Sequence, residues 1–424
     1  MSAGSEQSRA APTREFYESF PYPWPPMSMP SLEDPFFETV MLNQSIGDFS
    51  HRSIPADGRI WVAGCGTNQA VYTALRFPHC RVLGSDLSEA SLDFSKRTAM
   101  ALDIRNLELR AEDLNEAAYD AQFDYIISTG VVHHNREPAR ALATIAKALR
   151  RGGVLELMVY NQFHRRLNTS IQQAVRLITR EGDRVSTFED ELDVARALVE
   201  LVPGAGESAA YFRAAHRSEV ADSLIQPVEA SYTVSTLRDL ARSCGLDLLL
   251  PCPNQFDKAL GHLWSLAVPS PALQARIDGL PDASRWQLAN LLKMEQSPML
   301  WFYLRHESEV PSCGYEMTAN ESFLRHAFKP AATRVRNYFR NASELAYTAG
   351  KSMFPYPAPP IDPLMQKVLA QMDGERSMRE VLADVGVDTT ARDTISEIRL
   401  RSTTSVFPYL RAVARNGLYA DPTQ

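Results

Sequence analysis

Short apolar runs alternate with longer segments of mixed polarity between residues 56 and 160. Such runs are typical of buried strands, and their regular alternation with helices is typical of a parallel sheet. Residues 88–101 and 137–149 are predicted helices, the second with Pro138 near its start and Gly152 just past its end. Residues 154–160 are predicted to form a buried strand, and the crossover connections are expected to be right-handed.

The pattern changes after residue 160. Helical periodicity runs through residues 167–178 and 191–201, which predicts a helical insertion after the fifth strand. The remaining sheet elements are predicted in four segments. These are a helix within 230–240 with Ser235 as its N-cap, a strand at 246–250, a helix around 287–294 and a seventh strand at 299–304.

Both ends of the chain depart from this pattern. An aromatic segment rich in proline, residues 16–26, precedes the sheet, and its aromatic content predicts that it packs on something. After the sheet, basic and aromatic side chains cluster in a predicted helix, which we interpret as a solvated face or an interface. They are Arg325, Phe328, Lys329, Arg334, Arg336, Tyr338, Phe339 and Arg340. A helix, an Asp-Gly turn and a second helix follow, with a last helix and turn at 407–418.

These patterns divide the chain into consecutive parts. The parts are an N-terminal arm (1–50), a sheet domain (51–306) with a helical insertion (161–230), a linker and helix (307–360) and a C-terminal domain (361–424). The length of 424 residues is enough for two or three domains with real cores.

Composition narrows the possible partners. The net charge of −7 gives no global basic footprint, so no nucleic-acid partner is expected. No apolar run is long enough to span a bilayer, and the N-terminus lacks the apolar core of a secretory signal, so no membrane partner is expected. Five cysteines without a pairing rhythm indicate reduced thiols and a cytoplasmic protein. No cluster has the spacing of metal ligands, so no metal site is expected.

A glycine-containing turn carries the clearest chemical signal. The apolar run 60–63 ends in Gly64-Cys65-Gly66, a helix follows, and Asp86 ends the next apolar run. Glycines allow a tight turn and a close approach of the backbone to a nucleotide, and the acid can accept the hydroxyls of a ribose. A dinucleotide site has a third glycine where this chain has Gln69, so a ligand with a ribose but no pyrophosphate fits this turn better.

This turn resembles the first motif of the class I S-adenosylmethionine (SAM) methyltransferases, which often reads Val-x-Gly-Cys-Gly-Thr-Gly. Later segments resemble the family's landmarks in the same order. They are 82–88 for the second strand, 111–114 for the adenine corner, 123–127 for the fourth strand, 130–134 for the segment after it and 151–155 for the turn into the fifth strand. A subset of the family carries a similar Tyr- and Pro-rich segment before this domain, and the C-terminal part resembles small winged-helix-like tails.

The resemblance implies a Rossmann-like, doubly wound α/β sheet of seven strands, with helical insertions and a small, mainly α C-terminal domain. It also implies SAM as the cofactor. The implied cofactor-binding residues are Gly64, Cys65, Gly66, Gln69, Asp86, Leu87, Asp113, Leu114, Thr129 and Gly130.

Two positions depart from the family pattern. Val62 stands where an acid usually helps to orient the methionine end of SAM, so the ammonium group must find other acceptors, such as the backbone carbonyls at 128–130. Asn68 replaces the third glycine, and Asn is the non-glycine residue that best tolerates a left-handed backbone. Neutral drift and an altered methionine pocket are both open interpretations of these changes.

The candidate catalytic residues are His134, as a general base, and its neighbour His133, because both follow the fourth strand at the carboxyl edge of the sheet. The alternative is that these histidines only shape the pocket through hydrogen bonds. The candidate substrate-binding residues are Tyr17, Tyr22, Tyr160 and Asn161. The two N-terminal tyrosines belong either to a lid over the sulfonium or to an arm that packs on the domain surface or on a partner subunit.

The sequence therefore predicts a SAM-dependent methyltransferase that acts on an oxygen or nitrogen nucleophile of a small, biosynthetic substrate. A homodimer is compatible with it. Three further possibilities stay open: a peptide or protein acceptor, a SAM-consuming cyclase or lyase on the same fold, and a non-catalytic SAM-binding regulatory subunit.

Overall fold

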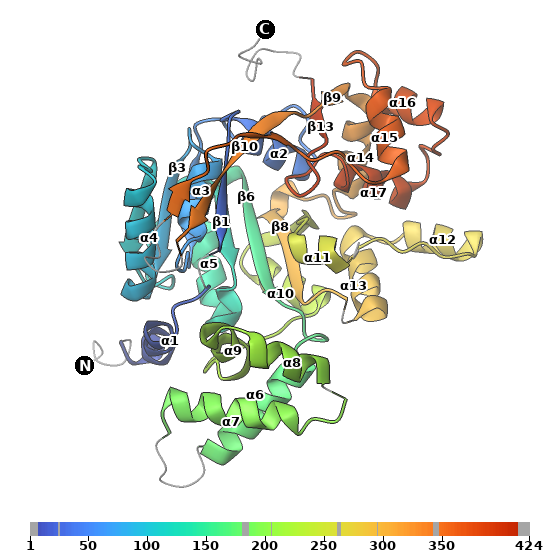
Figure 1. Cartoon of the computed structure of the whole chain (residues 1–424). Helices are drawn as coiled ribbons and strands as arrows, with labels where there is room; N and C mark the ends of the chain where they lie inside the picture. Colours follow the sequence, from blue (N-terminus) through green and yellow to red (C-terminus); the bar gives the residue numbers. More distant parts are fainter. Residues whose placement is uncertain are drawn as a thin grey trace.

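The computed structural model describes residues 7–23, 26–179, 186–204, 206–260, 264–294, 296–341 and 347–413. A sheet of seven strands in the order β4-β3-β2-β5-β6-β8-β7 forms its centre (Figure 1). The strands are β2 (Arg59–Ala63), β3 (Arg81–Asp86), β4 (Leu107–Ala111), β5 (Phe123–Thr129), β6 (Leu149–Tyr160), β7 (Leu246–Pro251) and β8 (Met299–His306). Within this sheet, β8 runs antiparallel to both of its neighbours. The predicted doubly wound α/β sheet is confirmed.

The helices between the parallel strands cover the two faces of the sheet. Helices α3 (Gln69–Arg76) and α4 (Glu89–Ala101) connect β2, β3 and β4, whereas α5 (Pro138–Ala148) connects β5 to β6 in the opposite direction. Right-handed crossovers then place α5 on the other face. The order reverses between β2 and β5, and the carboxyl ends of these two strands flank a crevice at which ligands bind in such sheets.

A helical insertion follows β6, as predicted. It consists of α6 (Arg166–Thr179), α7 (Phe188–Glu200), α8 (Gly206–Ala214) and α9 (Arg217–Leu224). These helices share an apolar core with α1 (Gln7–Ser19), which buries Phe16, and with Phe20 just after it, both of them completely buried. In Figure 1 they lie at one end of the sheet, beside the carboxyl ends of its parallel strands.

The helix that follows the insertion starts differently from the prediction. Helix α10 (Val234–Ser243) has Thr233 as its N-cap, so the prediction of Ser235 is wrong. Thr233 and Thr236 form a reciprocal capping box, and the backbone N–H of Ser235 donates to Gln287 at 2.8 Å. Three more helices precede β8. They are α11 (Gln255–Leu260), α12 (Pro271–Asp278) and α13 (Asp282–Lys293).

The predicted basic helix after the sheet is also wrong beyond residue 325. The segment forms α14 (Glu316–Arg325), β9 (Phe328–Pro330) and β10 (Thr333–Arg340). The reason is a distant partner: β1 (Ser28–Leu32) of the N-terminal arm pairs with β10 along the whole length of β1. Two short strands complete this sheet, β11 (Tyr347–Ala349) and β12 (Phe354–Tyr356).

The C-terminal segment packs at the end of the sheet opposite to the insertion helices (Figure 1). It contains α15 (Pro363–Ala370), α16 (Met378–Asp384), α17 (Arg392–Leu400) and β13 (Leu410–Ala412), which pairs with β9. The predicted helix, turn and helix are present as α15 and α16. A last helix from residue 407 is wrong, because residues 410–412 are a strand; residues 414–418 lie outside the described residues.

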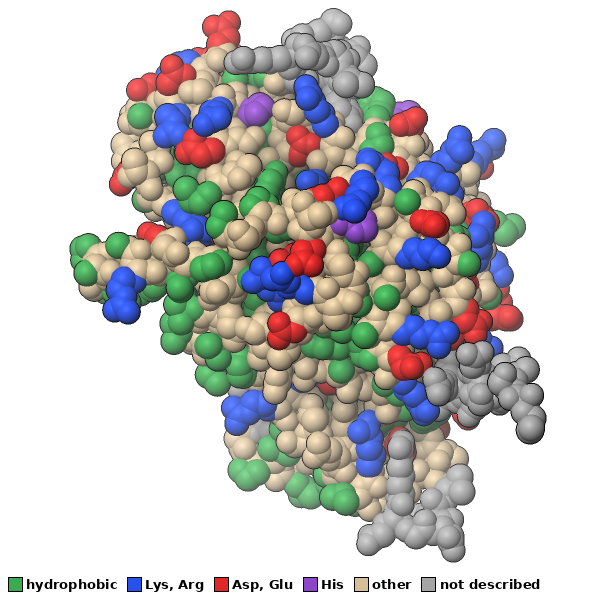
Figure 2. Space-filling model, turned by 180° about the vertical axis from the view of Figure 1, so that it is seen from behind, with side chains coloured by type: hydrophobic (Ala, Val, Ile, Leu, Met, Phe, Trp, Pro, Cys, Tyr) green, Lys and Arg blue, Asp and Glu red, His purple; other side chains and the backbone are tan. Residues whose placement is uncertain are grey.

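Surface charge is mixed on the face shown in Figure 2, where Lys and Arg side chains are interspersed with Asp and Glu side chains. Basic residues of β10 and α14 have acidic neighbours, such as Glu33 for Arg334 and Glu321 for Arg325. In the described part of the chain, no helix has the length and apolar character needed to cross a bilayer.

The buried side chain of Gln44 is one of the groups that connect the arm to the C-terminal segment. Gln44 lies in α2 (Phe37–Ser45) and is fully buried. Its amide donates to the carbonyls of Thr403 and Leu410 at 3.1 and 2.9 Å, and its oxygen accepts from the N–H of Ala412 at 2.7 Å. The N-terminal arm and the C-terminal segment are thus held together by side-chain hydrogen bonds.

We predict that Gln44→Leu lowers the free energy of unfolding by about 3 kcal/mol, because three buried backbone groups lose their partner. Urea unfolding measures this change. The matched control is Gln287→Leu, which removes one bond to an exposed N–H and is expected to cost less than about 1 kcal/mol. Equal losses in both variants would contradict a connecting role for Gln44.

Candidate active site

One cavity of about 550 Å³ opens at the carboxyl edge of β2 and β5. This volume is in the usual range for small-molecule sites. The lining residues come from α1 and the segment after it, from the loops after the parallel strands, and from the insertion. Among the described residues, none beyond Trp301 lines the cavity, so the C-terminal segment does not form its wall.

The turn after β2 requires its glycines. Gly64 and Gly66 have φ values of +74° and +54°, in the left-handed region that favours glycine. A Cβ on Gly64 would collide with the side chain of Val131, and a Cβ on Gly66 would lie 2.5 Å from the carbonyl oxygen of Tyr22. Asn68 has a φ of −156°, so its predicted tolerance of a left-handed backbone is not needed here.

Asp86 at the end of β3 faces the same turn. Its carboxylate accepts the N–H of Gly66 at 2.8 Å and the N–H of Ser88 at 2.9 Å. Burial raises the pKa of Asp86, and these N–H groups lower it and oppose that rise. Two backbone donors therefore fix the orientation of a carboxylate at the cavity wall, where it fits the ribose hydroxyls of the implied cofactor.

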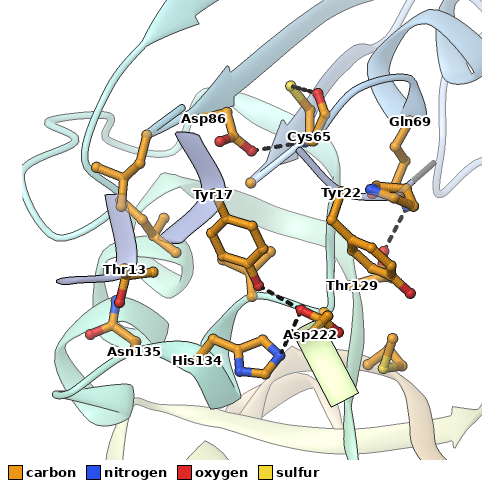
Figure 3. Close-up of a pocket in the computed structure, with 18 of the residues that line it drawn as sticks. Thr13, Tyr17, Tyr22, Cys65, Gln69, Asp86, Thr129, His134, Asn135 and Asp222 are labelled. Atoms are coloured by element: carbon orange, nitrogen blue, oxygen red, sulfur yellow. Dashed lines mark hydrogen bonds and ion pairs between the residues drawn. The ribbon is translucent and has the colours of Figure 1, made fainter. Parts of the chain in front are cut away.

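All ten predicted cofactor-binding residues line this cavity. Across the cavity from Asp86, Gln69 donates to the hydroxyl of Thr129 at 2.7 Å (Figure 3). Val62 is fully buried in β2, so its position supplies no acid to the site. Burial raises the pKa of the Cys65 thiol well above its usual range, which keeps it neutral. The carboxylate of Asp86 and the polar groups of Gln69 and Thr129 on the cavity wall fit a nucleoside that carries a polar substituent, such as SAM.

The two histidines differ in position. They lie in a short 3₁₀ turn, η1 (Val132–His134), after β5. His134 lines the cavity, and its Nδ1 lies 2.9 Å from the carbonyl oxygen of Val228. Because a carbonyl only accepts, Nδ1 carries the hydrogen, and Nε2 of the neutral ring is an acceptor on the side of Asp222. This geometry suits the predicted general base.

His133 does not line the cavity. It is fully buried, and its ring centroid lies 4.2 Å from that of His134 and 4.0 Å from that of Tyr160. Burial lowers the pKa of His133 well below its usual range, and the neighbouring His134 and Arg165 lower it further. The structure therefore gives His133 a packing role behind His134, not the substrate contact that the sequence suggested.

Three of the four predicted substrate residues line the cavity: Tyr17, Tyr22 and Tyr160. Asn161 does not, and this prediction is corrected. It is buried, and its amide donates to the carbonyls of Met294 and Ser297, both at 2.8 Å. Asn161 thus fixes the segment before β8.

Sequence reasoning missed Asp222 of α9. Its carboxylate is buried and accepts the hydroxyl of Tyr17 on one oxygen and that of Tyr160 on the other, both at 3.0 Å. Gln226 donates to the Tyr17 hydroxyl at 2.9 Å, which leaves the tyrosine hydrogen for Asp222. Figure 3 shows Tyr17 between Asp86 and Asp222, with its hydroxyl directed at Asp222. The partners lie 205 and 62 positions away, so no local motif marks this aspartate.

A buried ion pair supports this cluster. Arg165 donates to both carboxylate oxygens of Glu229, at 2.9 and 2.6 Å, and its guanidinium carbon lies 4.1 Å from the ring centroid of Tyr160. Gln172 donates to the same carboxylate at 2.8 Å. The pair holds the Tyr160 ring in place while its own charges are mutually satisfied.

Comparisons with known proteins agree with this site. Residues 61–155 match the family model of a methyltransferase domain. The structure of PKMT2 from Rickettsia typhi is similar, with a TM-score of 0.55 at 13% identity, over 93% of this chain and 77% of that one. Its complex with AdoHcy (S-adenosylhomocysteine) is similar with a TM-score of 0.55 at 15% identity, over 93% and 78% of the two chains. An uncharacterized protein from Synechococcus sp. is 28% identical over 319 residues, 72% of this chain and 73% of that protein.

The fold and the cofactor half of the cavity define a class I methyltransferase with a Rossmann-like sheet. Residues 61–155 are a methyltransferase domain, so the chain is a SAM-dependent methyltransferase.

We predict that Asp86→Ala weakens SAM binding at least tenfold, about 1.4 kcal/mol, because the ribose loses its carboxylate. Calorimetric titration of the full chain measures this affinity. Asp93→Ala is the matched control, since Asp93 is exposed on α4 and forms an ion pair with Lys96 on the same helix. Unchanged affinity in Asp86→Ala would remove this residue from the cofactor site.

We also predict that Gly64→Ala destabilises the fold more than Gly245→Ala. Both glycines have a φ near +75°, so backbone strain of about 1–3 kcal/mol is common to the two variants. Only the Cβ at Gly64 meets a neighbour, Val131, whereas at Gly245 no atom lies within 4 Å. The additional loss at Gly64 is about 1–3 kcal/mol by urea unfolding, and a loss equal to that of Gly245→Ala would contradict the close packing.

Proposed function

We propose that this methyltransferase acts on an oxygen or nitrogen nucleophile of a small molecule that binds beneath the N-terminal arm. One observation carries the proposal: the glycine turn, Asp86, His134 and the tyrosines of the arm all line the same cavity. SAM supplies an electrophilic methyl group when bound. The protein then has to position the acceptor, take its proton and exclude water.

The arm is suited to exclude water. The carbonyl of Tyr22 lies against Gly66, the hydroxyl of Thr67 donates to the carbonyl of Pro23, and the hydroxyl of Ser88 donates to the carbonyl of Tyr17 at 3.3 Å. The arm therefore rests on the loops after both β2 and β3. Because these loops hold the cofactor, we infer that the arm is a lid that opens for exchange of SAM and its product.

A second candidate acceptor is a peptide or protein side chain. The fold resembles that of PKMT2 over most of the chain, and the C-terminal segment lies at the far end of the sheet from the cavity. A segment that does not line the site is available to hold a larger substrate. Deletion of residues 307–424 is not a suitable test of whether the C-terminal segment holds a peptide, because the deletion also removes β10, the partner of β1. Substitution of exposed side chains such as Ile361 leaves the fold intact and is the better test.

We predict that His134→Gln lowers kcat by about 10²–10⁴ while the affinity for SAM changes less than twofold, because the acceptor loses its base. The assay measures the release of S-adenosylhomocysteine from SAM with a panel of small hydroxyl and amine acceptors. His79→Gln, on the surface, is the control.

An unchanged kcat in His134→Gln would mean that His134 only shapes the pocket. The chemical identity of the product distinguishes methyl transfer from a different use of SAM. Methylthioadenosine in place of S-adenosylhomocysteine would indicate a cyclase or lyase reaction, and release of neither from bound SAM would favour a regulatory subunit.

A further inference from the structure

The side of the cavity that contains His134 and Asp222, where the methyl-accepting substrate is proposed to bind, is called the acceptor side. It has more hydrogen-bond acceptors than donors. His134 Nε2 and an oxygen of Asp222 face each other at 3.9 Å, too far apart for a direct hydrogen bond. His134 Nδ1 carries the hydrogen that is donated to the carbonyl of Val228, so Nε2 of the neutral ring is a hydrogen-bond acceptor. The facing oxygen of Asp222 is an acceptor as well. A group with several N–H donors would satisfy both of them.

The ionisable neighbour of Asp222 is His134, whose Nε2 lies 3.9 Å from the carboxylate. Across the described ranges, no ion pair joins Asp222 to a lysine or an arginine. The nearby Arg165 donates instead to both oxygens of Glu229 and to the carbonyl of Ser223 at 2.9 Å. The side chain of Asp222 is only 4% exposed, and a buried carboxylate requires compensation by donors or by a cation.

Two neutral hydroxyls, those of Tyr17 and Tyr160, donate hydrogen bonds to Asp222. Burial, and then the carboxylate of Asp222, raise the pKa values of Tyr17 and Tyr160 well above their usual range, so both hydroxyls stay protonated. Glu219, one turn earlier on α9, also lines the cavity and adds a second acid on this side. The acceptor side is therefore negative and already has its hydroxyl donors.

We propose that Asp222 and His134, supported by the hydroxyls of Tyr17 and Tyr160, bind the protonated amino group of the acceptor, so that the enzyme methylates an alkyl amine. This inference rests on the proposed function and names its substrate class. An alkylammonium brings a positive charge and up to three donors, whereas an alcohol brings no charge and one donor. The match of charge and donor number favours the amine.

The transfer is balanced with this arrangement. The ammonium gives one proton to His134 Nε2, and the freed nitrogen lone pair forms the new N–CH₃ bond. The electron pair of the broken S–CH₃ bond stays on sulfur. The products are the methylated ammonium ion, S-adenosylhomocysteine with a neutral sulfur, and one proton, which His134 releases to solvent.

Val62, at a position where the family usually has an acid, suggests a competing role for Asp222. Because the usual acid is missing there, Asp222 could instead hold the ammonium group of SAM itself. Figure 3 shows Tyr17 between Asp222 and Asp86, so the Tyr17 ring separates Asp222 from the predicted ribose acid. The two roles differ in which ligand loses affinity when Asp222 is changed.

The test uses the full chain, Asp222→Asn and the control Asp239→Asn, a surface acid on α10. Calorimetry measures SAM affinity, and ligand-observed NMR measures binding of n-butylammonium and n-butanol to the enzyme saturated with S-adenosylhomocysteine. We expect n-butylammonium to bind at least tenfold tighter than n-butanol. We expect Asp222→Asn to abolish this preference, with SAM affinity within twofold of wild type, and Asp239→Asn to change neither.

Two results would overturn the inference while methyl transfer itself stands. One is a loss of SAM affinity in Asp222→Asn with n-butylammonium binding unchanged, and the other is turnover of alcohols but not of amines. Failure of the proposed function has a different signature, in which no acceptor yields S-adenosylhomocysteine although n-butylammonium binds. Tyr17→Phe provides a second variant with an intact carboxylate, for which we expect a weaker but detectable loss of n-butylammonium affinity.

An alkylammonium group can come from a small amine or from a lysine side chain. Mass spectrometry of reactions with n-butylamine and with a short lysine-containing peptide separates these sources. Methylation of either amine supports the assignment of Asp222. Methylation only at peptide hydroxyls would overturn it.

Discussion

The contact of the N-terminal arm with the glycine turn is the constraint on which the site depends. Gly66 has no side chain, and the carbonyl of Tyr22 occupies the space that a Cβ would need. This close approach lets the arm lie directly on the cofactor loop, and it brings Tyr17 within 3.0 Å of Asp222. Residues of the arm thereby line the same cavity as the cofactor loop and Asp222.

Both ends of the arm are anchored by burial and by pairing. Phe16 and Phe20 are fully buried among the insertion helices, and complete burial of one phenylalanine contributes about 1.5–3 kcal/mol. On the other side, β1 pairs with β10 along its whole length, and Gln44 binds the C-terminal segment. For an arm held at both ends, the proposed opening requires a local movement of α1 and the segment after it, with the sheet pairing retained. The C-terminal segment therefore stabilises the arm without touching the cavity.

The cofactor half could be predicted from the sequence because its groups are close along the chain. Gly64, Gly66 and Asp86 come from two successive strand ends, and a parallel sheet places such ends at one edge. The acceptor half could not be predicted in the same way. Asp222 meets Tyr17 across 205 positions. His134 lines the cavity whereas the adjacent His133 does not, and their neighbouring places in the sequence do not reveal this difference.

The sequence by itself determined the alternating strands and helices, the glycine turn and the ribose acid, since these follow from local periodicity and backbone sterics. Only the tertiary structure decided that residues 333–340 are a strand, because their partner β1 lies about 300 positions away, as the Ser28–Phe339 and Leu32–Val335 pairs show. It also decided that Asp222 is a buried carboxylate that faces His134 and forms no ion pair with a lysine or an arginine among the described residues. Burial and long-range pairing are properties of the folded chain, and no stretch of sequence carries them alone.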